Sequence, residues 1–211
     1  MGEREYQICT NCVMDTTDWS TNFDDKGVCN HCTNFYDNIK PNWHPDENSA
    51  NEIHMIAEKI RKEAKGKKHD CILGFSGGVD SSYLAYIAKE VLNLNPLLYV
   101  VDTGWNQKGT VDNINKVSKG LGLDIVTEVV NWEEMKDLQL AFLKSQIQSQ
   151  DLPQDHAIFA GLYNYAVRNG FKYVLTGANT ATECILPGGG WGGGNDIVLI
   201  KDIHKKFGKI K

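Results

Sequence analysis

The stretch Asp70-Cys-Ile-Leu-Gly-Phe-Ser-Gly-Gly-Val-Asp-Ser-Ser82 decides the fold. A short apolar run leads into a Ser-Gly-Gly turn, and the turn opens an amphipathic helix. The two glycines let the backbone approach a ligand without a Cβ clash, and the serine hydroxyls lie at the positive N-terminus of the helix. The sequence therefore predicts an anion-binding loop between a strand and a helix. The groups expected to hold the anion are Ser76, Gly77, Gly78, Ser81 and Ser82.

The loop fits neither the GxxxxGK[ST] pattern nor the GxGxxG pattern. SGGVDSS at 76–82 resembles the pyrophosphate-binding motif of the PP-loop ATP pyrophosphatases, which cleave ATP to AMP and pyrophosphate while adenylating a substrate oxygen. We expect ATP as cofactor, with Asp80 as the carboxylate that holds Mg²⁺, because Mg²⁺ prefers hard oxygen ligands. Ser76 and Asp80 are the candidate catalytic residues on this loop.

Gly74-Phe-Ser-Gly-Gly78 also fits GxSxG, the nucleophile elbow of serine hydrolases. His156 and His204 could complete a triad, but nothing in a hydrolase requires Asp80-Ser81-Ser82. A glycine-rich turn without a ligand would need fewer hydroxyls. We therefore favour the phosphate-binding interpretation over both alternatives.

The composition indicates a globular protein with one ordinary core and a small appendage. The chain has 211 residues, of which 41% are apolar and 23% charged. Its net charge of -5 argues against a nucleic acid bound mainly through its phosphates. No apolar stretch is long enough to span a bilayer and no signal-peptide pattern is present, so we expect a cytoplasmic protein without a membrane partner.

Four of the six cysteines form two CxxC pairs with a zinc-ribbon spacing. Each pair presents two thiolates from one knuckle, and two knuckles complete a closed tetrahedral site without an open position for water. We expect structural Zn²⁺, with a disulfide pair or an iron–sulfur cluster as alternatives. His31, between the second pair, is expected to face water. The predicted metal ligands are Cys9, Cys12, Cys29 and Cys32.

Three segments follow from the pattern: a zinc-ribbon-like part over 1–45, a linker helix within 46–69 and a PP-loop domain over 70–211. Apolar runs predict strands over 70–75, 96–101, 123–129 and 171–176. Helical periods between them predict helices over 81–92, 111–119, 132–149 and 155–168, and a helix over 51–65 precedes them. The fold class is therefore α/β, a doubly wound parallel sheet with an N-terminal zinc ribbon.

Further polar residues follow the predicted strands. Asp102 ends the second strand, where PP-loop enzymes receive the adenosine, although a solvated strand end would look the same. Gly177, in TGANTATE at 176–183, permits close backbone approach, and Asn179 and Glu183 are candidates for substrate contacts. A capping box would explain the same two residues. The glycine-rich segment around Trp191 reads equally well as a lid or as a connector.

The motifs together resemble those of the N-acetyl sugar amidotransferases of surface polysaccharide and acetamidino sugar biosynthesis. They are CTNCVMDTTD at 9–18, CNHC at 29–32, LGFSGGVDSS at 73–82, TGANTATE at 176–183 and IHKKFG at 203–208. The resemblance implies that ATP adenylates the acetamido oxygen of a nucleotide-linked N-acetyl sugar and that ammonia then displaces AMP. It places Asn179, Glu183 and Trp191 on the sugar side, with Glu183 also in the reaction. Asp196 and His204 are further candidates on that side.

The chain lacks an evident glutaminase. Residue 2 is Gly, four cysteines are assigned to metal, and neither Cys71 nor Cys184 is flanked by glycine. Ammonia must then come from elsewhere, and the resemblance implies separate glutaminase and cyclase-like subunits. Two rival functions remain open: a tRNA thiolase of the PP-loop type, and a non-catalytic zinc-ribbon module that only binds a nucleotide.

Overall fold

The computed structural model describes residues 4–178 and 196–210. These residues form two compact units, the first ending at Ser49 and the second beginning at Ala50. The second unit contains the predicted α/β sheet and the first contains the four clustered cysteines.

The sheet of the second unit has four parallel strands in the order β3-β2-β1-β4. They are β1 (Ile72–Gly74), β2 (Leu97–Asp102), β3 (Ile125–Val129) and β4 (Val174–Leu175). Each lies within or next to a predicted strand, and β1 and β4 are shorter than predicted. The central strand β1 pairs Leu73 with Leu98 on one side and with Leu175 on the other.

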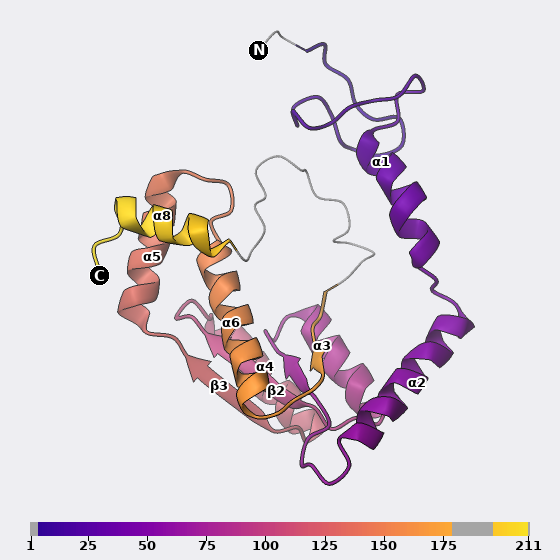
Figure 1. Ribbon diagram of the computed structural model, residues 1–211, viewed down its shortest axis with the longest axis vertical. Helices are drawn as coiled ribbons and strands as arrows, with labels where there is room; N and C mark the ends of the chain where they lie inside the picture. Colours follow the sequence, from indigo (N-terminus) through magenta and orange to yellow (C-terminus); the bar gives the residue numbers. More distant parts are fainter. Residues whose placement is uncertain (1–3, 179–195, 211) are drawn as a thin grey trace. The chain divides into compact units, whose positions relative to one another are not determined.

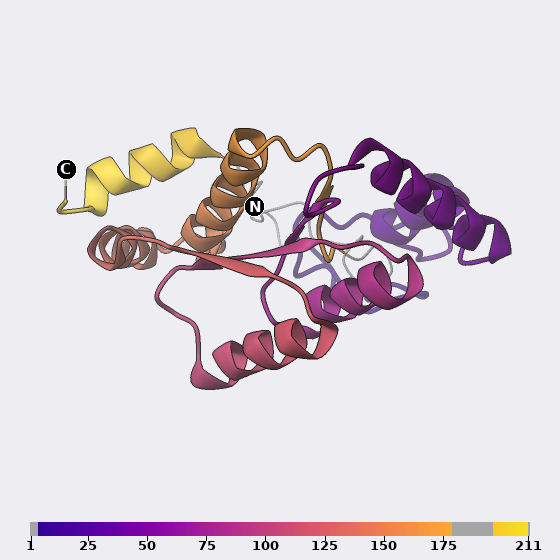
Figure 2. The ribbon, with the colours of Figure 1, turned by 90° about the horizontal axis from the view of Figure 1, so that it is seen from below.

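Helices cover both faces of this sheet, which confirms the doubly wound α/β class (Figure 1). Leu73, Leu98 and Val100 pack against α3 (Val79–Tyr86) and α4 (Lys108–Leu121). The alternate residues Ile72 and Tyr99 pack against α6 (Leu152–Arg168) on the opposite face. Figure 2 shows α3 and α4 on one side of the strands and α6 on the other. The inner strands β1 and β2 are largely buried, as parallel strands between helices are, whereas the edge strand β3 is exposed from Thr127 to Val129.

The remaining helices extend this core. The π-helical turn η3 (Ile87–Val91) continues α3, and α2 (Glu47–Glu63) packs Ala57 and Ile60 beside it. α5 (Trp132–Ser145) is capped by Asn131. Within the described residues, no helix has both the length and the apolar character needed to cross a membrane.

In the second unit, the helix that follows the glycine-rich segment was not predicted from the sequence. α8 (Ile197–Phe207) begins at Asp196, whose carboxylate accepts from the amides of Val198 and Leu199. It buries Ile200 and Ile203 against α5 and the start of α6. Because the glycine-rich segment precedes it, the helical period of these residues was missed.

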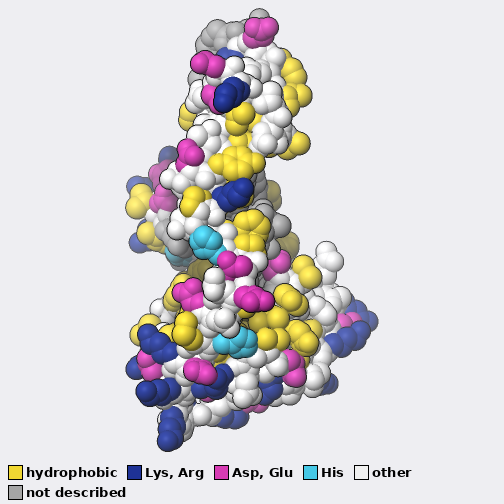
Figure 3. All heavy atoms as spheres, turned by 90° about the vertical axis from the view of Figure 1, so that its right-hand side faces the viewer, with side chains coloured by type: hydrophobic (Ala, Val, Ile, Leu, Met, Phe, Trp, Pro, Cys, Tyr) yellow, Lys and Arg dark blue, Asp and Glu magenta, His cyan; other side chains and the backbone are white. Residues whose placement is uncertain are grey.

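The first unit is built around the cysteines and contains little regular structure. Isolated antiparallel bridges join Ile8 to Asp15 and Phe23 to Cys29. Three helical turns follow, namely α1 (Asn30–Asn34), η1 (Phe35–Ile39) and η2 (Lys40–Asn42), which the sequence pattern did not predict. The unit leaves Val13 and Trp19 exposed, and hydrophobic side chains are visible on its surface at the top of Figure 3.

Candidate functional site

The Ser-Gly-Gly loop lies where the sequence predicts it, at the carboxyl end of β1 and the beginning of α3. The amide of Phe75 donates to the Tyr99 carbonyl at 2.8 Å and is the last ladder bond before the chain turns away. β1 lies between β2 and β4 in the sheet. The strand order therefore reverses at β1, with β2 and β3 on one side and β4 on the other. In doubly wound folds, ligands bind beyond the strand ends at this switch point.

The loop carries a set of unused hydrogen-bond donors. Within the described part of the chain, no acceptor contacts the backbone amides of Gly77, Val79, Asp80 and Ser81. The Gly78 amide is bound to the Ser76 hydroxyl at 3.3 Å. Gly78, the N-cap of α3, offers no side chain to satisfy the first turn. Free amides at a helix N-terminus favour a phosphate group, so the loop fits the triphosphate of ATP.

The three serines of the loop differ in their surroundings. The Ser81 hydroxyl is held inside the loop, 3.1 Å from the Ser76 hydroxyl and donating to the Gly78 carbonyl at 3.2 Å. The Ser82 hydroxyl is shielded from solvent and contacts no partner among the described residues. Ser76 is exposed. The structure therefore leaves Ser76 as the accessible hydroxyl, while Ser81 fixes the shape of the loop.

Packing within the protein also requires glycine at positions 77 and 177. Gly77 has a φ of +74°, and a Cβ there would lie 2.7 Å from Ile114 Cγ1 of α4. The Asn113 side chain also donates to the Gly77 carbonyl. A Cβ on Gly177 would lie 3.1 Å from the Ser81 amide nitrogen, so the chain after β4 packs closely against the start of α3. A role for Gly177 in binding the cofactor stays a prediction.

The two acidic residues of the predicted site are placed differently. Asp80, in the first turn of α3, is exposed, and no described residue binds its carboxylate, so both oxygens are free for a cation. Asp102 ends β2, and its Oδ1 accepts from the Gly104 amide at 2.9 Å and from the Asn106 side chain at 3.2 Å. Asp102 therefore shapes the following loop, and a role in adenosine binding stays a prediction.

The hydrolase alternative finds no support in the described residues. The Ser76 hydroxyl contacts Ser81 and the Gly78 amide, with no histidine in contact. A serine nucleophile needs an adjacent base within hydrogen-bond reach. The sugar-side candidates Asn179, Glu183 and Trp191 lie outside the described residues.

Comparison with known proteins then decides the family. The model of the family described as NAD synthase matches residues 50–209, about the whole of the second unit. The chain belongs to the NAD synthase family. The ribbon unit lies outside this match.

Relatives of this NAD synthase family chain are diverse. An uncharacterized protein of Methanocaldococcus jannaschii is 28% identical over 170 residues, which make up 80% of this chain and 58% of the relative. A glutamine-hydrolysing GMP synthase from Limosilactobacillus reuteri is 36% identical over 88 residues, 41% of this chain and 16% of that protein. The chain thus spans little more than half of the first relative and a small part of the second.

Among solved structures, the chain is similar to the NH3-dependent NAD synthetase from Campylobacter jejuni subsp. jejuni in complex with nitrate. The TM-score is 0.48 at 20% sequence identity, and the match covers 74% of this chain and 72% of that chain.

Four cysteine side chains lie close together in the ribbon unit. The sulfur atoms of Cys9, Cys12, Cys29 and Cys32 all lie within 4.8 Å of one another, as a tetrahedral metal site requires. Burial opposes ionisation of Cys9, but the amides of Asn11 and Cys29 that donate to its sulfur lower the pKa of the thiol to about 6. Burial raises the pKa of the neighbouring Cys12 and Cys29 thiols. The amide donors at Cys9 are suited to a metal-bound thiolate, so the residues fit Zn²⁺.

We expected His31 to face water, but the structure buries most of its side chain. Only 11% of its side chain is exposed. Its Nε2 lies 3.3 Å from the Asp18 carboxylate and 3.4 Å from the Thr21 hydroxyl. His31 therefore ties two loops of the ribbon together.

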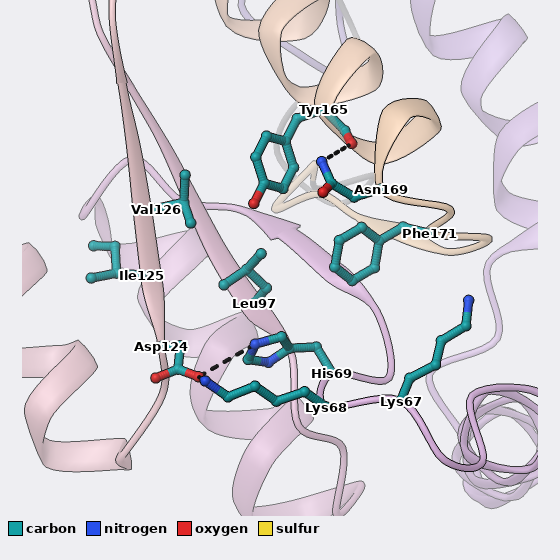
Figure 4. A pocket seen from close by; sticks show the side chains of 10 residues that line it. All are labelled: Lys67, Lys68, His69, Leu97, Asp124, Ile125, Val126, Tyr165, Asn169 and Phe171. Carbon is teal, nitrogen blue, oxygen red and sulfur yellow. Dashed lines mark hydrogen bonds and ion pairs between the residues drawn. The ribbon is translucent and has the colours of Figure 1, made fainter.

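A cavity of about 660 Å³ lies at the other edge of the sheet, where the strands begin (Figure 4). Its floor includes Leu97 and Phe171, and at its rim Lys68 and His69 both contact the Asp124 carboxylate. Lys67, at the same cavity, donates to the Gly170 carbonyl. The donors and the carboxylate predicted to bind ATP and Mg²⁺ lie at the carboxyl edge instead.

Proposed function

We propose that this chain is the ATP-binding and adenylating part of an amidotransferase that acts on a nucleotide-linked N-acetyl sugar. The acetamido oxygen is adenylated by ATP, and ammonia replaces it to give an acetamidino sugar. Membership in the NAD synthase family supports the class of reaction, because this family and the relatives named GMP synthase are ATP-dependent ligases. The sugar acceptor rests on the sequence motifs.

The observation that carries the proposal is the loop between β1 and α3. Four backbone amides and the Asp80 carboxylate, none of which binds another described residue, stand with the exposed Ser76 hydroxyl at one helix N-terminus. The amides suit the departing pyrophosphate, because the charge that develops on it is met by dipoles that are already oriented. Asp80 would hold Mg²⁺, which neutralises phosphate charge when it is bound.

The reaction proceeds in two displacements. The acetamido oxygen forms a bond to the α-phosphorus of ATP, and the bond to pyrophosphate breaks. Ammonia then adds to the activated carbon, AMP leaves with the former acetamido oxygen, and loss of a proton gives the amidine. The loop amides and Ser76 serve the first displacement. Asn179, Glu183 and Trp191 are proposed to hold the sugar, with Glu183 placing the incoming ammonia.

The proposal includes partners. Since the sequence carries no evident glutaminase, ammonia is supplied by separate glutaminase and cyclase-like subunits. The zinc site serves the fold of the ribbon, because four thiolates fill a tetrahedral ion and leave no position for substrate. A cytoplasmic location, where ATP is available, completes the proposal.

Release of pyrophosphate tests the proposed function. The chain is incubated with MgATP, ammonium and a UDP-linked N-acetyl sugar, and pyrophosphate is measured together with the mass of the sugar product. We expect stimulation by the sugar and a product lighter by the exchange of oxygen for an NH group. Stimulation by tRNA instead would favour the thiolase, and ATP binding without any turnover would favour the nucleotide-binding module.

A further inference from the structure

Two tryptophans lie together at the carboxyl edge of the sheet. Trp105 is in the loop after β2, and Trp132 is the first residue of α5, shortly after β3. Their ring centroids are 4.9 Å apart at an interplanar angle of 66°. Trp105 is 47% exposed and Trp132 is 40% exposed. An aromatic pair left half in solvent is an unused contact surface, because Trp normally buries much of its large area.

Contacts with neighbouring residues hold the Trp132 ring in place. Its ring lies directly on the backbone of Gly104, where a Cβ would come within 2.4 Å of Cε3, and Gly104 has a φ of +88°. Asn131 holds the start of α5 by accepting from the Glu133 amide at 3.0 Å. Lys136 lies over the same ring, 5.9 Å from its centroid. Trp132 therefore acts as a rigid support for the neighbouring ring of Trp105.

The same loop is tied to the phosphate-binding loop. Asp102 fixes its first residues through Gly104 and Asn106, and the loop ends at α4. The first turns of α4 lie against Gly77, through the side chain of Ile114 and the donor group of Asn113. Gly74 at the end of β1 pairs with Tyr99, so β2 and β3 run three residues farther before they end at Asp102 and Val129. With strands about 5 Å apart and a rise of about 3.3 Å per residue, these two ends lie roughly 11 Å and 14 Å from the end of β1.

We propose that Trp105, backed by Trp132, stacks on the nucleobase of ATP while the Ser-Gly-Gly loop holds the phosphates. This inference rests on the proposed use of ATP. A ligand that reaches both features must combine a polyanion with a flat ring, and a nucleotide has this combination. The indole face accepts any planar base, so the contact adds affinity without reading hydrogen bonds.

A purely structural role for the two tryptophans and a role in base stacking predict different effects on ligand binding. If Trp105 only anchors the loop, its removal loosens the loop and weakens every ligand of the site alike. If it stacks on the base, its removal weakens nucleotides and spares a ligand that has phosphates but no base. Tripolyphosphate is such a ligand.

Calorimetric titration of Trp105→Ala with MgATP and with magnesium tripolyphosphate separates these cases. We expect the dissociation constant of ATP to rise about 5- to 150-fold, the range of one base–aromatic stack. That of tripolyphosphate should stay within twofold. Trp105→Phe should recover most of the ATP affinity. Trp19→Ala, which removes an exposed tryptophan of the ribbon unit, should change neither constant.

Three results would overturn the inference. Equal weakening of both ligands assigns Trp105 to loop structure. Weakening of a UDP-linked N-acetyl sugar with unchanged ATP affinity assigns the platform to the base of the acceptor. Unchanged affinity throughout excludes any contact. If wild-type protein binds neither ATP nor tripolyphosphate, the proposed function fails as well, and that outcome is distinct from the other three.

A second measurement does not depend on the fold of a variant. Indole fluorescence of the wild-type protein should be quenched by ATP and left unchanged by tripolyphosphate at saturation. Trp132→Phe, which keeps an aromatic support, should retain this quenching. Equal responses to the two ligands would contradict stacking.

Discussion

Asp80 has a side chain that the fold does not use. Its carboxylate is exposed and contacts no described residue, although it stands in the first turn of α3 beside the free amides. We expect Asp80→Asn to lower pyrophosphate release at least a hundredfold, since it removes the proposed Mg²⁺ ligand, with little change in thermal stability. Enzyme assay and circular dichroism check the two parts.

A matched control is Glu58→Gln, which neutralises an exposed carboxylate on α2. It should retain full pyrophosphate release. Wild-type turnover by Asp80→Asn would remove Asp80 from the proposed mechanism, and equal losses in both variants would point to net charge instead.

Gly77 combines a left-handed φ with a close neighbour, Ile114. We expect Gly77→Ala to lower the free energy of unfolding by about 1–3 kcal/mol, because it adds backbone strain and a steric clash. Gly120→Ala is the control. A Cβ there meets nothing within 4 Å and lies inside α4, so the variant should be neutral or more stable. Urea unfolding measures both, and an unchanged Gly77→Ala would contradict the geometry.

At the scale of elements, Asp137 of α5 holds the residues that follow α8. Its Oδ2 accepts from the amides of Lys209 and Ile210 at 2.8 Å and 2.9 Å, and lies 3.3 Å from Nε2 of His204. These donors, the amide of Ile210 foremost, hold the pKa of Asp137 below its usual value. The carboxylate therefore stabilises the folded state when it is ionised.

The pH dependence follows from this direction. A lowered folded pKa gives stability that is fully present above the unfolded pKa of about 3.9 and is lost as pH falls through the folded pKa. Asp137→Asn should unfold at lower urea than wild type at pH 7, and the difference should shrink below about pH 4. Asp202→Asn on α8 is the control for an exposed carboxylate. A difference that is constant with pH would exclude the mechanism.

We propose that the four clustered cysteines bind Zn²⁺ and that the ribbon needs this ion to form a core. We expect Cys29→Ser to lose bound zinc and to expose the ribbon to proteolysis, while the second unit still binds ATP. Cys71→Ala is the control. Burial in the second unit raises the pKa of the Cys71 thiol to about 12, so it stays protonated and binds no metal. Zinc is measured by mass spectrometry, and ATP binding by calorimetry. Selective loss of catalysis in a folded Cys29→Ser protein would indicate a catalytic metal.

At the scale of the whole molecule, we predict that ammonia reaches the reaction from outside this chain. Free ammonium at high concentration should replace glutamine and the partner subunits, and the rate should rise with pH because only the unprotonated amine reacts. Glutamine alone should give no product with the isolated chain. Product mass and pyrophosphate release are the measurements. Glutamine-dependent turnover by this chain alone would refute separate subunits.

Particular elements show how far sequence reasoning reached. The strands and the phosphate loop were predicted in place, because apolar runs bounded by turn residues are local signals. α8 was missed, although Asp196 is a recognisable N-cap. The pair of Trp105 and Trp132 was not singled out, because nothing local indicates that two loops 27 residues apart in sequence meet.

The sequence by itself determined the fold class, the sulfur cluster and the position of the phosphate loop. Each depends on residue types at short, fixed spacings, which set local conformation. Only the tertiary structure decided that Ser81 faces into the loop, that Gly77 is packed against Ile114 and that Asp102 binds its own loop. These contacts depend on which face of a helix or strand packs against its neighbour. Segments that are far apart in the sequence determine this packing, so a local sequence pattern does not predict it.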